Sequence, residues 1–226
     1  MKTLKLLVVA AWEPELTRFR ARSGAAAIAG LEVAIETLGV GLVESAVGMT
    51  RCILRHRPAA ALLIGSCGAF EGALPAAQLG VGAVVVGARV RLVDASVDAA
   101  VSALPAPMPA DATFDGGVHD ALVAAGARSV HIANTVGITV DDALAARLAG
   151  CGDVEHLEAF GFARACVAEG LPCGAVLGVA NMVGGRGRAE WLAHHASASD
   201  NAADVACDAL AAIVTSMSVR RSTTSP

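Results

Sequence analysis

Residues 155–191 read EHLEAFGFARACVAEGLPCGAVLGVANMVGGRGRAEW, and this stretch decides the fold. Apolar residues recur at helical spacing from Leu157 to Ala168, and a glycine and a proline then end that helix. An apolar run of strand length follows at 173–179 and breaks at Asn181 into a glycine-rich segment. Open α/β sheets bind ligands just past the carboxyl ends of buried strands. We therefore expect Glu158, at the helix entrance, and Asn181, at the strand exit, to face one pocket.

The composition indicates one water-soluble domain. The 226 residues are 55% hydrophobic and 17% charged, and nothing in them marks a linker, so we expect one domain over 1–219 and a disordered tail over 220–226. No stretch of 18 apolar residues is free of charge, which argues against a membrane span. The apolar run near the N-terminus passes straight into Glu13 and Glu15 and is interpreted as a first strand.

The net charge argues against a nucleic-acid-binding protein, and the cysteine spacing argues against a zinc-binding protein. A net charge of −4 without a basic face does not favour a nucleic-acid partner. The six cysteines form neither CxxC pairs nor zinc-spaced sets with histidines, so we expect no metal and a reducing, cytoplasmic location.

The rest of the chain alternates predicted strands with predicted helices. This alternation predicts an α/β fold, in which one central mixed, largely parallel twisted sheet is flanked by helices. The segment 95–113, rich in alanine and proline, is expected to be an irregular loop. The predicted strands are 5–11, 31–38, 59–64, 81–86, 90–93, 129–140 and 173–179, and the predicted helices begin near Pro14, Leu42, Val118, Asp142, Leu157 and Ala189.

Two segments beyond predicted strand ends are candidate ligand contacts. Glu15 follows the first strand, where an acid also suits a helix N-terminus, and residue types alone favour that structural role. The Gly65–Gly68 segment, GSCG, is predicted to be a loop, and both a plain turn and a ligand cradle remain open for it. Cys67 has no histidine or lysine nearby in sequence to activate it as a nucleophile.

Taken in order, several segments resemble the nucleoside phosphorylase and nucleosidase superfamily, and within it the nucleosidase branch that includes methylthioadenosine/S-adenosylhomocysteine nucleosidase and futalosine hydrolase. The resemblance covers nearly the whole chain and implies the fold of that superfamily. The segments that carry it are AAWEPEL (10–16), LGVGLVESAVG (38–48), LIGSCGAF (63–70), LGVGAVVVGARVRLVDASV (79–97), EHLEAFGFA (155–163) and VLGVANMVG (176–184).

The resemblance implies three catalytic residues. Glu15 matches the glutamate that orients and deprotonates the attacking water, and Glu158 matches the one that holds the ribose hydroxyls. Asn181 matches the purine-facing acid. Breaking an N-glycosidic bond needs an activated nucleophile, a stabilised sugar cation and help for the departing base, and these side chains supply one group for each task.

Five further positions are implied to contact the substrate. Ser66 and Gly68 match the loop that flanks ribose and base, and His156 and Leu157 match positions that line the sugar and base. Thr139 is expected near the base. The glycine-arginine loop of the phosphorylases is absent after the first strand, so water is the expected nucleophile, without cofactor or metal.

At Asn181 the sequence departs from the family's pattern in an informative way, because the methylthioadenosine enzymes carry aspartate at this position. Asparagine can donate a hydrogen bond to a 6-oxopurine but cannot protonate N7 of adenine. Together with the pattern Asn-x-Val-Gly-x-Arg-x-Arg-x-x-Trp, which looks like futalosine hydrolase, this implies hydrolysis of futalosine to hypoxanthine and dehypoxanthine futalosine, a step of menaquinone biosynthesis.

Two alternatives remain open. One is adenine release from methylthioadenosine or S-adenosylhomocysteine, and the other is a non-catalytic nucleoside sensor or interaction module. Ala180 and the Ala159–Gly161 segment depart from the family's pattern and keep the second alternative open. The resemblance further implies a nucleoside substrate, no membrane partner and a homo-oligomer, expected to be a dimer.

Overall fold

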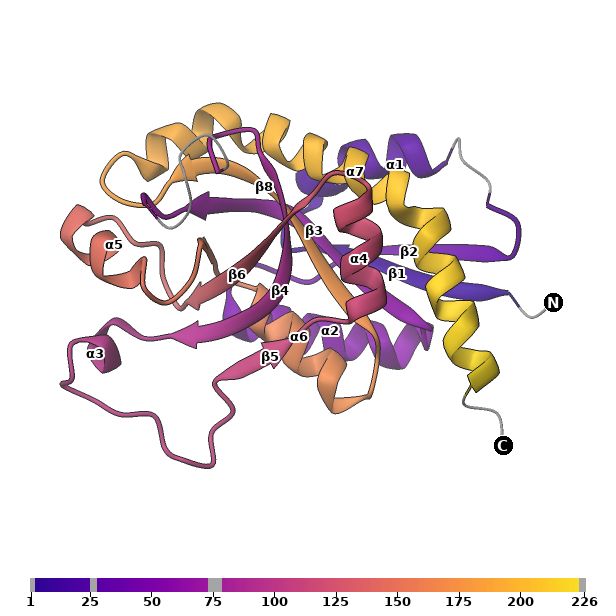
Figure 1. Cartoon of the computed structure of the whole chain (residues 1–226), viewed down its shortest axis with the longest axis horizontal. Coiled ribbons are helices and arrows are strands. Elements are labelled where there is room, and N and C mark those ends of the chain that lie inside the picture. The colour runs from indigo at the N-terminus through magenta and orange to yellow at the C-terminus, as the bar shows by residue number, and fades with distance from the viewer. Residues whose placement is uncertain (1–2, 25–27, 73–78, 224–226) are drawn as a thin grey trace.

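The computed structural model describes residues 3–24, 28–72 and 79–223, which form one α/β domain (Figure 1). The strands are β1 (Leu4–Ala10), β2 (Leu31–Thr37), β3 (Ala60–Ala69), β4 (Val84–Val93), β5 (Asp111–Thr113), β6 (Arg128–Thr135), β7 (Val154–His156) and β8 (Cys173–Met182). The helices are the 3-10 turn η1 (Glu13–Leu16), α1 (Thr17–Ser23), α2 (Leu42–His56), α3 (Ala95–Asp98), α4 (Gly116–Ala124), α5 (Asp142–Leu148), α6 (Ala159–Ala168) and α7 (Gly187–Thr223).

The strands form a mixed sheet that closes on itself. β2, β1 and β3 are parallel neighbours at one edge. β3 also pairs with β7 and β8, β7 pairs with β6, β6 with β4, and β4 with β8, so these five strands form a closed ring. The pairs β3–β7, β4–β8 and β4–β5 are antiparallel, and the other pairs are parallel. The predicted mixed, largely parallel sheet is confirmed.

Helices cover both faces of the sheet (Figure 1). On one side α1, α4 and α7 pack over β1, β3 and β8, with Phe19, Leu122 and Ile213 fully buried between them. On the other side α2 and α6 pack on each other and on the sheet, around Met49 and Phe162. Both faces of the parallel strands are therefore buried, which explains why these strands are continuous apolar runs in the sequence.

Several predicted boundaries are wrong. Gly65–Gly68 is not a loop, because β3 continues through it to Ala69, with a register shift against β8 between Cys67 and Gly68. The two strands predicted at 81–86 and 90–93 are one strand, β4, with an irregularity where it pairs with β6. The strand predicted over 129–140 ends at Thr135. In β3 and in β4 a register shift interrupts the pairing with a neighbouring strand without ending the strand itself, and a composition pattern does not reveal this.

The segment predicted as an irregular loop over 95–113 contains α3 and β5, and the short strand β7 was not foreseen. The Asp94 side chain caps α3 by accepting hydrogen bonds from the backbone of Ser96 and Val97. β5 pairs antiparallel with β4 over three residues. Elements this short depend on tertiary pairing and leave little periodicity in the sequence.

α7 is the longest helix, and it packs against the sheet at the carboxyl side of β8. Its window Gly187–Val219 is long and apolar enough by composition to cross a membrane. One face of it is nevertheless buried on the sheet, including Ala202, Ala206 and Leu210. The opposite face carries Asp204, which pairs with Arg18 of α1 at 2.8 Å. α7 therefore buries its sheet-facing side in the core of the domain.

The close approach of α7 to β8 requires a glycine at position 178. A Cβ atom there would collide with the backbone of Ala198 in α7. α7 also continues to Thr223, past residue 219 where the sequence analysis ended the domain. Residues 224–226 of the expected disordered tail lie outside the described residues.

Candidate active site

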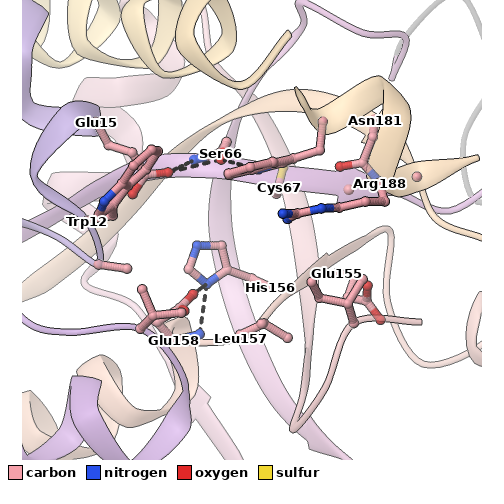
Figure 2. A pocket seen from close by; sticks show the side chains of 16 residues that line it. Trp12, Glu15, Ser66, Cys67, Glu155, His156, Leu157, Glu158, Asn181 and Arg188 are labelled. Carbon is pink, nitrogen blue, oxygen red and sulfur yellow. Dashed lines mark hydrogen bonds and ion pairs between the residues drawn. The ribbon is translucent and has the colours of Figure 1, made fainter. Parts of the chain in front are cut away.

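A cavity of about 340 Å³ opens where the ends of β1, β3, β7 and β8 meet (Figure 2). Such a position, at the carboxyl ends of parallel strands, is the usual ligand site of an α/β sheet. Its walls bring together residues that are far apart in sequence. The lining residues are Ala11, Trp12, Glu15, Val40, Ser66, Cys67, Gly68, Ile138, Glu155, His156, Leu157, Glu158, Asn181, Gly187, Arg188 and Trp191.

Glu15 lies in η1, directly after β1, and is 8% exposed. Its Oε1 accepts hydrogen bonds from the backbone N–H and the hydroxyl of Ser66, both at 3.0 Å. Burial raises the pKa of Glu15 from 4.5 to about 7, against the lowering effect of these two hydrogen bonds, and the charge of Glu158 raises it slightly further. A carboxyl group with a pKa near neutrality can exchange protons at physiological pH, as a general base must.

The glycines around Ser66 are explained by this geometry. A Cβ atom at Gly65 would lie 3.3 Å from Oε1 of Glu15, and one at Gly68 would lie 2.9 Å from Nδ2 of Asn181. A Cβ atom at Gly187 would lie 3.0 Å from the same nitrogen. The GSCG segment is therefore a strand rather than a turn or a loop, and Ser66, Cys67 and Gly68 of this strand line the cavity. Because Gly65 and Gly68 have no side chains, this strand leaves room for the side chains of Glu15 and Asn181.

Glu158 precedes α6 as its N-cap residue and is 6% exposed. Its Oε1 accepts a hydrogen bond of 2.7 Å from the backbone N–H of Gly41, just before α2. The hydroxyl of Ser45 donates to the Glu158 carbonyl at 3.0 Å, and a Cβ atom at Gly161 would collide with Ser45 and Leu42. Gly161 belongs to the segment that departs from the family's pattern, and a glycine is needed there for the close packing of α2 on α6 that holds Glu158.

His156 is buried beneath the cavity, beside Glu158 (Figure 2). Its Nδ1 lies 3.0 and 3.1 Å from the backbone N–H groups of Glu158 and Ala159, so this nitrogen is an acceptor. Burial lowers the pKa of His156, although the Glu158 charge opposes this. We therefore assign a neutral imidazole with its proton on Nε2, and we treat the 3.2 Å approach of Nδ1 to Glu158 Oε2 as a contact rather than an ion pair.

Asn181 is the second-last residue of β8 and is half-buried. Its Nδ2 donates to the carbonyl of Met182 at 2.9 Å, which fixes the orientation of the amide. Figure 2 shows the amide oxygen on the side of the cavity. The oxygen and the second hydrogen of Nδ2 therefore remain for a ligand.

Seven of the eight site residues predicted from the sequence line this cavity, namely Glu15, Ser66, Gly68, His156, Leu157, Glu158 and Asn181. Thr139 is absent from the lining. It is buried behind Glu155, to which its hydroxyl donates at 2.5 Å and its backbone N–H at 3.3 Å. Thr139 therefore reaches the cavity only through Glu155, while the base contact expected of it remains a prediction.

Trp12, Glu155 and Arg188 also line the cavity, although sequence patterns assign them no individual role; Arg188 and Trp191 entered only through the pattern that looks like futalosine hydrolase. The indole N–H of Trp191 donates to the Ser66 hydroxyl at 3.2 Å, and its ring lies 6.2 Å from that of Trp12. A usable signal existed, because the chain has two tryptophans and both line this cavity. Glu155 is the first residue of the quoted motif 155–163, and it lies in the unforeseen strand β7.

Cys67 lines the cavity but is buried, and burial raises the pKa of its thiol. The thiol form is a poor nucleophile, in agreement with the sequence-based interpretation. Over residues 3–24, 28–72 and 79–223, no group of three or more histidine, cysteine, aspartate or glutamate side chains is arranged to hold a metal ion. The available chemistry is that of carboxylates, an amide and backbone N–H groups.

Solved structures similar to this one are nucleosidases. A methylthioadenosine/S-adenosylhomocysteine nucleosidase from Colwellia psychrerythraea, in complex with adenine, matches with a TM-score of 0.79 at 18% identity, over 94% of this chain and 96% of that chain. A futalosine hydrolase mutant from Helicobacter pylori matches with 0.79 at 14% identity, over 96% of this chain and 100% of that chain. The nucleosidase from Neisseria meningitidis, in complex with methylthio-immucillin-A, matches with 0.78 at 20% identity, over 91% and 98%.

The chain has the nucleosidase fold. The resemblance drawn from the sequence motifs is confirmed at this level, along nearly the full length of both chains. No protein-family model matches the chain, and neither does any curated protein. At these identities the likeness shows the architecture alone, so the activity has to be argued from the residues of the cavity.

Glu15 should make the stability of the folded chain fall as pH rises. Its pKa is about 7 in the folded state against 4.5 when exposed, so the native state binds the proton more tightly. This contribution is fully present below pH 4.5 and is lost between pH 4.5 and 7. Glu15→Gln should therefore gain stability relative to the parent across that window, by roughly 3 kcal/mol at most.

The measurement is urea unfolding of both proteins at pH 4.5, 6 and 8. Glu13→Gln is the matched control, because Glu13 lies in the same turn but its side chain is 61% exposed. A stability difference between Glu15→Gln and the parent that does not change with pH would contradict the raised pKa.

Proposed function

We propose that this chain hydrolyses the N-glycosidic bond of a purine nucleoside, with water as the nucleophile. The observation that carries the proposal is the convergence of Glu15, Glu158 and Asn181 on one cavity. These groups meet the three needs of the reaction, which are an activated nucleophile, a stabilised sugar and an assisted leaving base. The nucleosidase fold supports the same conclusion.

Glu15 is proposed as the general base. Its Oε1 is occupied by the two donors of Ser66, which leaves Oε2 for a water molecule at the sugar. Because the site is buried, the carboxylate that forms above pH 7 is poorly solvated and is a strong acceptor for a proton of that water.

Glu158 is proposed to hold the ribose. Its Oε1 accepts from Gly41, and its second oxygen accepts a ribose hydroxyl proton. As the glycosidic bond breaks, positive charge develops on the sugar, and the nearby carboxylate stabilises it more strongly in the transition state than in the ground state. Neutral His156 packs beside this carboxylate without cancelling its charge.

Asn181 is proposed to face the departing base, and a 6-oxopurine such as hypoxanthine fits it best. The free hydrogen on Nδ2 donates to N7 or O6, the two atoms over which a leaving 6-oxopurine spreads its negative charge. An amide cannot protonate N7, which an adenine leaving group needs. Futalosine, whose base is hypoxanthine, is the named substrate that we propose, and it places the chain in menaquinone biosynthesis in the cytoplasm.

Adenine release is the second candidate. An asparagine amide also matches the N6 and N7 edge of adenine in geometry. Methylthioadenosine/S-adenosylhomocysteine nucleosidases are among the solved structures that share the fold. The two candidates differ in which base leaves faster, so they are separated by kinetics.

We also propose that the active form is a homodimer. Six exposed apolar side chains lie on the two segments that contain Val40 and Ile138, which line the cavity, and a second copy that covered them would shield the reaction from water. They lie at the start of α2 and between β6 and α5. They are Val40 (61% exposed), Val43 (69%), Val47 (49%), Val136 (66%), Ile138 (54%) and Val140 (66%).

Glu15→Gln should lower kcat/KM for hypoxanthine release by about a hundredfold or more, because general-base catalysis contributes about that much. In the parent enzyme kcat/KM should rise with pH and level off above pH 7, as the carboxylate of Glu15 becomes ionised. The assay is chromatographic detection of free base from pH 5 to 9, with Glu13→Gln as control. Undiminished turnover in Glu15→Gln would remove Glu15 from the mechanism.

Asn181→Asp should lower hypoxanthine release by roughly five- to 150-fold, the cost of an unpaired buried polar group. The new carboxylate would meet the Met182 carbonyl where Nδ2 now donates, and it would repel the charge on the leaving base. The measured quantity is the ratio of kcat/KM for an inosine-type and an adenosine-type nucleoside with the same 5′ group.

Asn201→Asp is the matched control, because Asn201 also donates from Nδ2 to a backbone carbonyl, that of Gly82 at 3.1 Å, but lies outside the cavity. A parent enzyme that prefers the adenosine-type substrate would favour adenine release. A ratio that Asn181→Asp leaves unchanged would show that Asn181 does not contact the base.

Replacing Val43 and Val47 by aspartate together should convert the dimer to a monomer, because the two charges would be buried without partners at the interface. Analytical ultracentrifugation measures the mass. Val123→Asp is the control, since Val123 is 41% exposed on α4, which covers the opposite face of the sheet (Figure 1). A parent protein that sediments as a monomer would contradict the dimer.

A further inference from the structure

The hydroxyl of Ser66 connects the proposed general base to the first turns of α7. It donates to Oε1 of Glu15 at 3.0 Å, as Figure 2 shows, and it lies 3.2 Å from the indole nitrogen of Trp191. Trp191 is 125 residues from Ser66 in sequence, so this contact exists only in the folded chain. The reaction proposed above assigns no role to Trp191.

The direction of each hydrogen bond follows from what the three groups can do. An indole N–H can only donate, and an ionised carboxylate can only accept. The Ser66 hydroxyl must therefore accept from Trp191 and donate its single proton to Glu15. Without the indole N–H, the hydroxyl would be free to rotate and to give that proton to another acceptor.

Donation from Trp191 also strengthens the bond from Ser66 to Glu15. A hydroxyl that accepts a hydrogen bond becomes a better donor, because the hydrogen bonds in a chain polarise one another. The backbone N–H of Ser66 adds a second donor to the same Oε1 at 3.0 Å. With two donors on Oε1, a proton taken from water would be held on Oε2.

Contacts on the Trp191 ring hold the indole in the orientation that this donation requires. The ring of His195, one turn further along α7, stacks on it with 4.3 Å between centroids and 19° between the planes. The guanidinium carbon of Arg188 lies 5.2 Å from its centroid, and the ring of Trp12 lies 6.2 Å away. The preceding residue, Glu190, accepts a backbone hydrogen bond of 2.8 Å from the end of β8, which holds the start of α7 in place.

Other titratable groups also lie near Glu15. The charge of Glu158 raises the pKa of Glu15 slightly. Cys67 of β3 is held as the thiol, because burial raises its pKa, and His156 beside Glu158 is neutral, because burial lowers its pKa. Glu13, in the same turn as Glu15, is exposed and forms an ion pair of 3.1 Å with α1. A substitution at position 191 leaves all of these groups in place.

We propose, resting on the nucleosidase activity above, that Trp191 is a positioning residue for the general base: its indole N–H directs the Ser66 proton onto Oε1 of Glu15 and leaves Oε2 to take the proton of the attacking water. In that step one O–H bond of water breaks as its oxygen bonds to the sugar carbon, and its proton goes to Oε2. The electron pair of the glycosidic bond leaves with the base. Trp191 and Ser66 neither gain nor lose a proton.

The measurement is the titration of the Glu15 carboxyl carbon by NMR, with its signal identified by its absence in Glu15→Gln. Trp191→Phe keeps an aromatic ring but has no N–H, so the midpoint should move upward by roughly half a pH unit, the cooperative share of a charge-assisted hydrogen bond. Ser66→Ala removes the donor itself, and the midpoint should move upward by roughly one unit or more.

Trp12→Phe is the matched control. Trp12 lines the same cavity, but among the described residues Trp191 is the one indole that donates to Ser66. The Glu15 midpoint in Trp12→Phe should therefore remain that of the parent.

Trp191→Phe in the Ser66→Ala background separates the hydrogen bond from a general effect of the ring. If Trp191 acts through Ser66, the double variant should titrate like Ser66→Ala. A further upward movement there, or an unchanged midpoint in Trp191→Phe, would overturn the proposal. If Trp191→Phe does not fold, benzothienylalanine at position 191, which has sulfur in place of the indole N–H, should give the same upward movement, and an unchanged midpoint with it would also overturn the proposal.

The pH profile of kcat/KM for base release distinguishes this inference from the proposed function. Its midpoint should move upward in Trp191→Phe together with the NMR midpoint, and His195→Asn identifies any inflection that belongs to that imidazole. If the NMR midpoints move as expected but the parent cleaves no nucleoside, the hydrogen-bond chain is supported and the nucleosidase proposal fails. If Trp191→Phe is active and keeps the parental midpoint in kcat/KM, Trp191 does not position the base and the inference is wrong.

Discussion

The site depends on keeping one carboxyl group, that of Glu15, buried and still able to ionise. Burial alone would hold it protonated, and the two donors of Ser66 counteract this so that the pKa settles at about 7. Ser66 in turn accepts from the indole of Trp191, so strand β3 and helix α7 are joined through the same hydroxyl. A change of the Ser66 side chain should therefore alter the protonation of Glu15, because its hydroxyl donates one of the hydrogen bonds that lower that pKa.

The surrounding fold makes room for these side chains at positions where glycine lets a neighbouring group come close to the backbone. Gly65 and Gly68 lie inside β3, and Gly161 lies where α6 packs against α2; at each of these positions a side chain would crowd a neighbouring group. The first two make room for Glu15 and Asn181, and the third lets Ser45 reach the carbonyl of Glu158. Glycine in a strand or helix interior costs stability, roughly 0.5–1 kcal/mol per residue, which is consistent with a functional reason for each of these positions.

Much of the fold could be read from local patterns in the sequence, whereas the roles of the site residues were implied by the resemblance to a known superfamily. Buried strands appear as apolar runs, and Glu15, Glu158 and Asn181 stand at their ends or at a helix entrance. The errors arose where tertiary contacts override local signals. Gly65–Gly68 looks like a loop but is held in a strand by pairing with β8. β7 has three residues and exists only because β3 and β6 flank it. Trp12 carries no pattern of its own, and the pattern that contains Arg188 and Trp191 did not show where they meet: the Trp191 ring centre lies 5.2 Å from the Arg188 guanidinium carbon and 6.2 Å from the Trp12 ring centre.

The geometry separates two kinds of residue within one cavity. The groups proposed for bond cleavage are buried and tied to strands or to a helix entrance, as shown by the 8% and 6% exposure of Glu15 and Glu158. Arg188 and Trp191, which also line the cavity, lie in the first turns of α7, after a segment held by hydrogen bonds from the backbone N–H of Met182 to Glu190 and from the backbone N–H of Gly185 to Asp142. The buried carboxyl groups and the exposed arginine of this cavity are therefore held by different elements, the turn after β1 and the entrance of α6 in one case and the start of α7 in the other.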